Sequence, residues 1–228
     1  MADASRLPRV MVVTDRRRLV SETGAADDEW PSLLEAQVSG ALAGGADFVQ
    51  IREPDVDART LVRTLRAVFT GVPESAHRVV INDRADVALA TGAAGVHLTE
   101  RSIRIDEART LQPAGIVWVV GRSIHDEAGA ATARGADYLV AGTVQPSRSK
   151  PEDPRLLGWK GLAAIVRAAG TVPVLAIGGL GPQHVQEIVD AGAVGLAGIG
   201  CFLPIRGEDV VASVRERVRA VRMAFDRA

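Results

Sequence analysis

The stretch Gly45-Ala46-Asp47-Phe48-Val49-Gln50-Ile51 decides the fold that this sequence predicts, because its pattern occurs four times. The other copies are Gly92-Ala93-Ala94-Gly95-Val96-His97-Leu98, Gly135-Ala136-Asp137-Tyr138-Leu139-Val140-Ala141 and Gly192-Ala193-Val194-Gly195-Leu196-Ala197-Gly198. Each leading glycine closes a helix-like stretch, where a positive φ is needed. Each apolar run is short and continuous, which is typical of a strand buried on both faces.

Four more apolar runs alternate with these copies. They occupy residues 10–14, 78–82, 116–120 and 173–177. The segments between the runs have helical spacing of apolar residues, so strands and helices alternate from end to end. Eight such units predict a single-domain α/β protein, a (β/α)8 TIM barrel over residues 1–228, since this fold takes about 200 to 250 residues. A doubly wound open sheet is the alternative, but it does not explain the fourfold period.

Composition limits the class of partner. The apolar share is 47 %, the charged share is 24 % and the formal net charge is -1, so the chain has no basic field for nucleic acid. No signal core and no membrane-length apolar run occur, and the single Cys201 permits no internal disulfide. We therefore expect a cytoplasmic protein that binds a small molecule, with a homo-oligomer as an open possibility.

Glycines after two of the predicted strands indicate a phosphate site. Gly178-Gly179 lets backbone approach a ligand, and Gly181-Pro182 is expected to open a helix whose N–H groups favour an anion. Gly198-Ile199-Gly200 repeats this geometry after the last strand, where barrels commonly hold phosphate. The alternative is that these glycines only end strands. The triplet Arg16-Arg17-Arg18 resembles a patch for a polyanion but is interpreted as a solvated loop after the first strand, on the functional face of the barrel.

Two side chains are candidates for chemistry. Lys150 is one of only two lysines and lies in a loop of Pro, Ser and Arg, where its ammonium could meet a phosphate or diphosphate. His125 follows a predicted strand end beside Ser123, and an imidazole is the side chain that most often transfers protons at neutral pH. The alternatives are an ordinary surface lysine, a helix-capping Ser123 and an idle His125. His97, inside a strand, is expected to be packed.

Six motifs taken together resemble one family, the thiamine phosphate synthase superfamily, over about residues 10–203. They are Val49-Gln50-Ile51-Arg52-Glu53, Ile81-Asn82-Asp83-Arg84, Gly95-Val96-His97-Leu98, Gly121-Arg122-Ser123-Ile124-His125, Ala136-Asp137-Tyr138 and Ala176-Ile177-Gly178-Gly179. The resemblance implies a barrel that binds a thiazole phosphate at Gly178, Gly179, Ile199 and Gly200. Gln50, Arg52, Asn82 and Ser123 are the further candidate ligands among these motifs.

The family includes a synthase, and the sequence departs from its pattern. The synthase joins a pyrimidine diphosphate to the thiazole phosphate with magnesium held by two aspartates; Asp83 matches the first, while Ser102 replaces the second. The usual Arg-Glu-Lys reads Arg52-Glu53-Pro54, which removes a cation expected at the diphosphate. The loop after the sixth strand keeps its hydroxyls and lysine as Ser147, Ser149 and Lys150.

The family also includes a thiazole tautomerase, whose pattern Gly-Arg-Ser-x-His matches residues 121–125. That resemblance implies proton transfer by His125 that aromatises a carboxythiazole phosphate, without metal or other cofactor. These features favour the tautomerase. The magnesium-dependent synthase is the alternative, because Arg52, Asn82 and Asp83 are retained, and a barrel that binds the phosphate without turnover is a further one.

Overall fold

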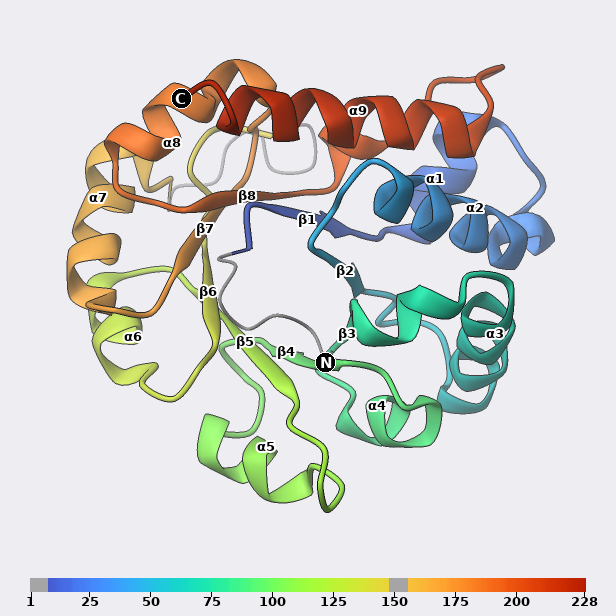
Figure 1. Cartoon of the computed structure of the whole chain (residues 1–228), viewed down its shortest axis with the longest axis horizontal. Helices are drawn as coiled ribbons and strands as arrows, with labels where there is room; N and C mark the ends of the chain where they lie inside the picture. The colour runs from blue at the N-terminus through green and yellow to red at the C-terminus, as the bar shows by residue number, and fades with distance from the viewer. Residues whose placement is uncertain (1–7, 148–155) are drawn as a thin grey trace.

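The computed structural model describes residues 8–147 and 156–228, and the strands in this part form one closed parallel barrel (Figure 1). The strands are β1 (Val10–Val13), β2 (Phe48–Ile51), β3 (Val79–Asn82), β4 (Gly95–Leu98), β5 (Val119–Ile124), β6 (Tyr138–Ala141), β7 (Val174–Ile177) and β8 (Gly195–Gly198). Each strand pairs with the next, and β8 pairs with β1. The predicted TIM barrel is confirmed.

Helices surround the barrel in the described part of the chain (Figure 1). They are α1 (Arg16–Thr23), α2 (Trp30–Ala43), α3 (Ala58–Gly71), α4 (Ala85–Thr91), α5 (Ile105–Leu111), α6 (Glu127–Thr132), α7 (Gly158–Ala169), α8 (Val185–Asp190) and α9 (Val210–Phe225), with 3-10 turns at Asp27–Glu29, Pro73–His77, Pro182–His184 and Gly200–Phe202. Aspartates cap several of them: Asp15 accepts from the Arg18 amide to begin α1, and Asp209 accepts from the Ala212 amide to begin α9.

The repeated glycines behave as their pattern predicts. Gly45, Gly92, Gly135 and Gly192 have φ angles of 91°, 71°, 92° and 84°. Other residues are destabilised by about 1–2 kcal/mol in this left-handed region, so glycine is favoured where each helix ends and the chain turns back toward its strand.

Two apolar layers explain why the strands read as unbroken apolar runs. One face of the barrel wall packs against the helices, and the other fills the barrel interior. The interior cluster consists of Met11, Val13, Val80, Tyr138, Val140, Leu175 and Ala197. Because both faces of each strand are covered, alternation of polar and apolar residues is lost.

The last helix packs closely on an early one. A Cβ on Gly40 would lie 2.6 Å from Val211 O, and one on Gly44 would lie 2.6 Å from Arg215 O. The two glycines therefore let the backbones of α2 and α9 approach each other.

One carboxylate joins the first strands to α9 at the amino end of the barrel. Asp47 Oδ2 accepts hydrogen bonds from the amides of Arg9 and Val10, at 2.8 and 2.9 Å, and pairs with Arg222 at 2.7 Å. Arg222 Nε also donates to Gly45 O at 3.1 Å. Since Asp47 and Arg222 are largely buried, the pair fixes where the ring closes.

The fifth strand lies later in the sequence than predicted. The expected run at residues 116–120 begins in an exposed turn, with Ile116 51 % and Val117 83 % exposed, and β5 instead extends to Ile124. The prediction was wrong because polar residues were taken to end the strand. At the carboxyl end of a barrel strand, side chains that face the central cavity are often polar, and Ser123 is one of them.

No helix in the described ranges is both long and apolar enough to cross a membrane.

Candidate functional site

A cavity of about 1140 Å³ opens at the carboxyl ends of the strands. Ten of the predicted site residues line it: Gln50, Arg52, Asn82, Ser123, His125, Ser147, Gly178, Gly179, Ile199 and Gly200. They come from strands spread around the whole ring, so the closed barrel is what brings them together. Asp83 follows Asn82 directly at the rim. Ser149 and Lys150 lie outside the described residues.

The ends of β7 and β8 form what we call the glycine cup, residues 178–179 and 199–200. Within residues 8–147 and 156–228, the amides of Gly179, Ile199 and Gly200 donate a hydrogen bond to no other group. Backbone N–H groups are obligatory donors, and several facing one cavity favour an anion. The cup therefore offers preorganised donors to a phosphate.

The structure changes the interpretation of Gly179. Its φ is 64°, and a Cβ there would lie 2.2 Å from Pro146 O. The loop after β6 is thus built directly against this glycine, so a β-branched residue at 179 would disturb the fold as well as the approach of a ligand. The helix expected at Gly181-Pro182 begins as the 3-10 turn Pro182–His184 before α8, with His184 Nδ1 accepting from the Gly181 amide at 3.1 Å.

Asp83 and Ser102 form what we call the acidic rim, after β3 and β4. Asp83 has a φ of 57°, uncommon outside glycine but tolerated by Asp and Asn. Ser102 Oγ donates a short hydrogen bond to Asp83 Oδ1 and also accepts from the Thr99 amide at 2.6 Å. The residue at the second predicted metal position therefore contacts the first, with a hydroxyl in place of a carboxylate.

A buried carboxyl organises the ends of β1 and β2. Thr14 Oγ1 donates to Glu53 Oε1 at 2.6 Å and accepts from the Arg52 amide at 3.0 Å, while Glu53 also accepts from the Arg16 amide at 3.1 Å. Burial raises the pKa of Glu53 to about 7, although these hydrogen bonds act in the opposite direction. This network fixes the backbone from which the exposed Arg52 side chain reaches the cavity.

His97 lies inside β4, as expected, and takes part in a buried chain of hydrogen bonds. Its Nδ1 lies 3.0 Å from Tyr138 Oη, and its Nε2 lies 2.8 Å from Ser123 Oγ. Burial lowers the pKa of His97 to about 3, so the imidazole is neutral at physiological pH. A neutral imidazole carries one ring proton and can donate at only one of these contacts.

Tyr138 decides which contact that is. Its hydroxyl is buried among apolar side chains, and His97 is its sole hydrogen-bond partner in the described part of the chain. Leaving the phenol proton unpaired would cost about 1–3 kcal/mol, so Tyr138 donates to Nδ1. Nε2 then holds the ring proton and donates to Ser123. The Ser123 hydroxyl proton is left to donate into the cavity that Ser123 lines.

His125 follows β5 directly, at the cavity wall. Its Nδ1 donates a short hydrogen bond to Gly142 O, because a carbonyl oxygen can only accept. In the neutral ring this places the lone pair on Nε2, where it can accept a proton. The geometry thus gives His125 the tautomer of a base.

Sequence reasoning missed several cavity residues, among them Arg18, Arg101 and Arg217. Arg18 was assigned to a solvated loop, yet it lies in the first turn of α1 and lines the cavity. Arg217 reaches the cavity from α9, far along the sequence. Nothing in the local sequence around Arg217 indicates its contact with the cavity. For Arg18, Asp15 could have been recognised as a helix cap, which would have placed Arg18 in the first turn of a helix at the cavity.

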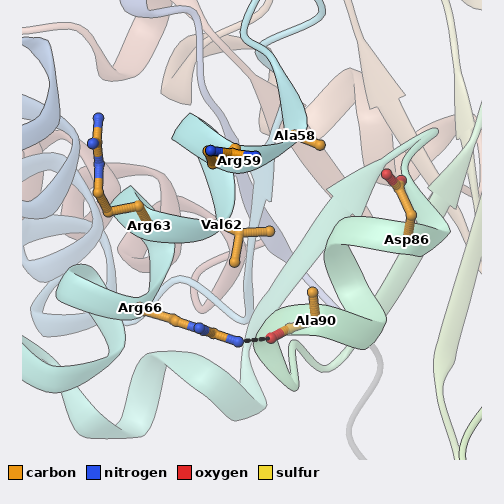
Figure 2. A pocket seen from close by; sticks show the side chains of 7 residues that line it. All are labelled: Ala58, Arg59, Val62, Arg63, Arg66, Asp86 and Ala90. Carbon is orange, nitrogen blue, oxygen red and sulfur yellow. Dashed lines mark hydrogen bonds between the residues drawn. The ribbon is translucent and has the colours of Figure 1, made fainter.

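A second hollow, of about 540 Å³, lies outside the barrel between α3 and α4 (Figure 2). Its lining residues are Ala58, Arg59, Val62, Arg63, Arg66, Asp86 and Ala90. Arg66 spans it and donates to Ala90 O at 3.0 Å. Because the hollow lies away from the strand ends, the larger cavity is the candidate site.

Two curated relatives are similar to this chain in sequence, and a solved structure is similar to it in fold, over most of its length. A putative thiamine-phosphate synthase of Geobacter sulfurreducens is 38 % identical over 92 % of this chain and 91 % of that protein. The thiamine-phosphate synthase of Moorella thermoacetica is 38 % identical over 81 % and 86 %. A thiamine phosphate pyrophosphorylase structure from Pyrococcus furiosus has a TM-score of 0.73 and 30 % identity, covering 96 % of each chain.

The two curated relatives bear the synthase name, so they support the alternative interpretation better than the tautomerase that the sequence favoured. The family model described as thiamine monophosphate synthase matches residues 19–202, which include the glycine cup and the acidic rim. The chain is an enzyme of thiamine biosynthesis and belongs to the thiamine monophosphate synthase family.

Proposed function

We propose that this enzyme is a thiamine-phosphate synthase, which joins a hydroxymethylpyrimidine diphosphate to a thiazole phosphate and releases diphosphate. One observation supports the proposal: hydrogen-bond donors suited to anions line the cavity at two separate places. The glycine cup offers amides at β7 and β8 that have no partner among the described residues, and Arg52 and Asn82 line the same cavity from β2 and β3. A tautomerase would hold one phosphate and the single carboxylate of its substrate, whereas the synthase must hold a phosphate and the more highly charged diphosphate at once.

Each end of the cavity has its own task. The cup would anchor the thiazole phosphate through backbone donors, and the Arg52 guanidinium would meet diphosphate oxygens. The Ser123 hydroxyl, with its proton directed into the cavity, would donate to a ring or phosphate acceptor between them. Orientation of two substrates in one cavity is itself a large part of catalysis for a two-substrate reaction.

The acidic rim fits magnesium with one carboxylate. Mg²⁺ prefers oxygen ligands and is commonly held by one or two carboxylates together with substrate phosphates and water. Asp83 supplies a carboxylate and Ser102 a hydroxyl in contact with it. When bound there, magnesium supplies positive charge to the departing diphosphate. With a single carboxylate, most of its coordination would come from the diphosphate and water.

The decisive assay uses the pure protein with pyrimidine diphosphate, thiazole phosphate and magnesium. We expect thiamine phosphate and diphosphate to form in equal amounts, and product formation to stop when magnesium is removed with a chelator. Binding of thiazole phosphate without any product, under conditions where an authentic synthase is active, would instead support a binding-only barrel.

The orientation of His125 favours a second candidate, the thiazole tautomerase. Its Nε2 is prepared to accept a proton, and the reaction needs one such group worth about 10²- to 10⁴-fold. His125→Asn keeps the hydrogen-bonding shape and removes the titrating group. A hundredfold slower conversion of the carboxythiazole tautomer, followed by the growth of thiazole absorbance, would support this activity, and unchanged conversion would remove it.

A further inference from the structure

The three consecutive arginines at the start of α1 have different surroundings. Arg16 and Arg17 both pair with Asp55, in the loop after β2, and Arg16 also pairs with Asp27 at 3.8 Å. In the described part of the chain, the Arg18 guanidinium has neither an ion-pair nor a hydrogen-bond partner. It is half-buried and lines the cavity.

Helix geometry turns Arg18 inward. Asp15 caps α1 by accepting from the Arg18 amide at 3.1 Å, which fixes the first turn of the helix. Successive side chains in a helix are rotated by about 100°, so Arg18 leaves the helix in a different direction from Arg16 and Arg17, whose long side chains converge on Asp55. With the first two arginines held by Asp55, the third faces the cavity beside β8.

Arg18 lies directly against the glycine cup. A Cβ on Gly200 would lie 3.0 Å from Arg18 Nη2, so the guanidinium is in contact range of the backbone at that position. Because residue 200 has no side chain, the donors of Arg18 and the unpaired amide of Gly200 are close to the same space. A phosphate in the cup could accept from both.

In the described part of the chain, no neighbouring carboxylate pairs with this cation. Asp15 also lines the cavity, but its carboxylate caps α1 by accepting from the Arg18 amide. Arg217 also lines the cavity, but it pairs with Glu208 at 3.2 Å and donates to Ser213 Oγ at 3.1 Å. Burial raises the pKa of the Cys201 thiol to about 12, so it carries no negative charge at neutral pH. A partly buried cation without an ion-pair partner is available to a ligand that supplies the opposite charge.

We propose that Arg18 is the side-chain ligand of the glycine cup and binds the phosphate monoester of the thiazole substrate by charge-assisted hydrogen bonds. This inference rests on the proposed function only in taking the cup as the thiazole phosphate site. The planar guanidinium suits phosphate oxygens, and such bonds are about twice as strong as neutral ones. The cup then combines backbone donors from β7 and β8 with one cation from α1.

Calorimetry with two ligands tests the role of Arg18. Titrate thiazole phosphate and the corresponding unphosphorylated thiazole alcohol into the unaltered protein, Arg18→Gln and Arg17→Gln. We expect Arg18→Gln to weaken binding of the phosphate about 10- to 100-fold and to change binding of the alcohol less than about threefold. Arg17→Gln, at the adjacent and mostly exposed position, is the matched control and should leave both affinities unchanged.

A conservative variant and a folding control distinguish a loss of the phosphate contact from a loss of structure. Arg18→Lys should recover part of the lost affinity, because it restores charge without the planar fork, and circular dichroism melting shows whether each variant is folded. Equal losses for phosphate and alcohol, unchanged phosphate affinity in Arg18→Gln, or no thiazole phosphate binding by the unaltered protein would each overturn the proposal. Binding needs neither pyrimidine diphosphate nor turnover, so a protein that binds as expected but makes no thiamine phosphate would refute the synthase and leave Arg18 in place.

Discussion

The glycine cup and the acidic rim are two parts of one cavity, but they are built in different ways. The cup uses backbone amides of residues that the barrel itself requires, such as Gly179, which the loop after β6 contacts. The rim uses the side chains of Asp83 and Ser102 on two separate loops. A backbone site persists as long as the fold does, whereas a side-chain site changes with a single substitution. This difference is consistent with a chain that keeps the family's glycines and departs from its pattern at the metal position.

The largest expected effect comes from breaking the rim. Asp83→Asn keeps a residue that tolerates positive φ but removes the only carboxylate of this pair. We expect the rate of thiamine phosphate formation to fall about 10²- to 10³-fold, because removing a single group that stabilises a charged transition state typically lowers the rate by this factor. Thiazole phosphate affinity, measured by calorimetry, should stay within about twofold. A comparable loss of that affinity would mean that the two ends are not independent.

The next effect separates fold from binding within the cup. Gly179→Ala places a Cβ 2.2 Å from Pro146 O at a φ of 64°, and should lower the free energy of unfolding by about 3 kcal/mol. Gly200→Ala is the matched variant, since its Cβ would meet only the end of the Arg18 side chain. It should cost less than about 1 kcal/mol of stability while weakening thiazole phosphate binding. Urea unfolding compares them, and equal stabilities would contradict a cup fixed by the fold.

Glu53 predicts a pH dependence in the loops that flank the cup. Its pKa is raised from 4.5 to about 7 in the folded protein, so the folded state holds the extra proton between these values. This contribution to stability is complete below about pH 4.5 and is lost as pH rises through 7. We expect the free energy of unfolding to fall by on the order of 2 kcal/mol between pH 5 and 9. In Glu53→Gln this part of the fall should vanish; an identical pH profile would contradict the assignment.

The smallest effect sharpens the rim. Ser102→Asp restores a second carboxylate beside Asp83, so magnesium should be held by the protein as well as by the diphosphate. We expect the magnesium concentration for half-maximal synthase rate to fall about tenfold, in the range that one added or lost ligand contact gives. A magnesium titration at fixed substrate measures it. If half-saturation is already low in the unaltered protein and does not move, the serine does not weaken the site.

The fold could be predicted because its signals are local. A glycine that must adopt a positive φ and a strand buried on both faces each leave a short pattern, and four repeats made the closed ring the simplest arrangement. The end of β5 was missed for a physical reason: cavity-facing strand ends are polar, so an apolar-run rule stops too early, before Ser123.

The candidate site was predicted less completely, because its contacts join distant residues. Glycines and His125 could be found from their position after strands. The path from Tyr138 through His97 to Ser123 depends on three strands facing one interior, and Arg18 depends on the rotation of a helix. Gly179 was interpreted as part of a phosphate site, with a strand end as the alternative, whereas the close approach of Pro146 O accounts for this glycine without any ligand.

The contact of Asp47 with Arg222 has a consequence for how the chain folds as it is made. The amides of residues 9 and 10, at the start of β1, and the side chain of Arg222, in α9, meet at this carboxylate. Synthesis proceeds at about 5–20 residues per second, so the first strand waits some ten seconds or more for its last partner. Until α9 emerges, α2 has no cover at Gly40 and Gly44. The ring is therefore expected to close late, and a nascent chain stalled before α9 should expose apolar surface to chaperones.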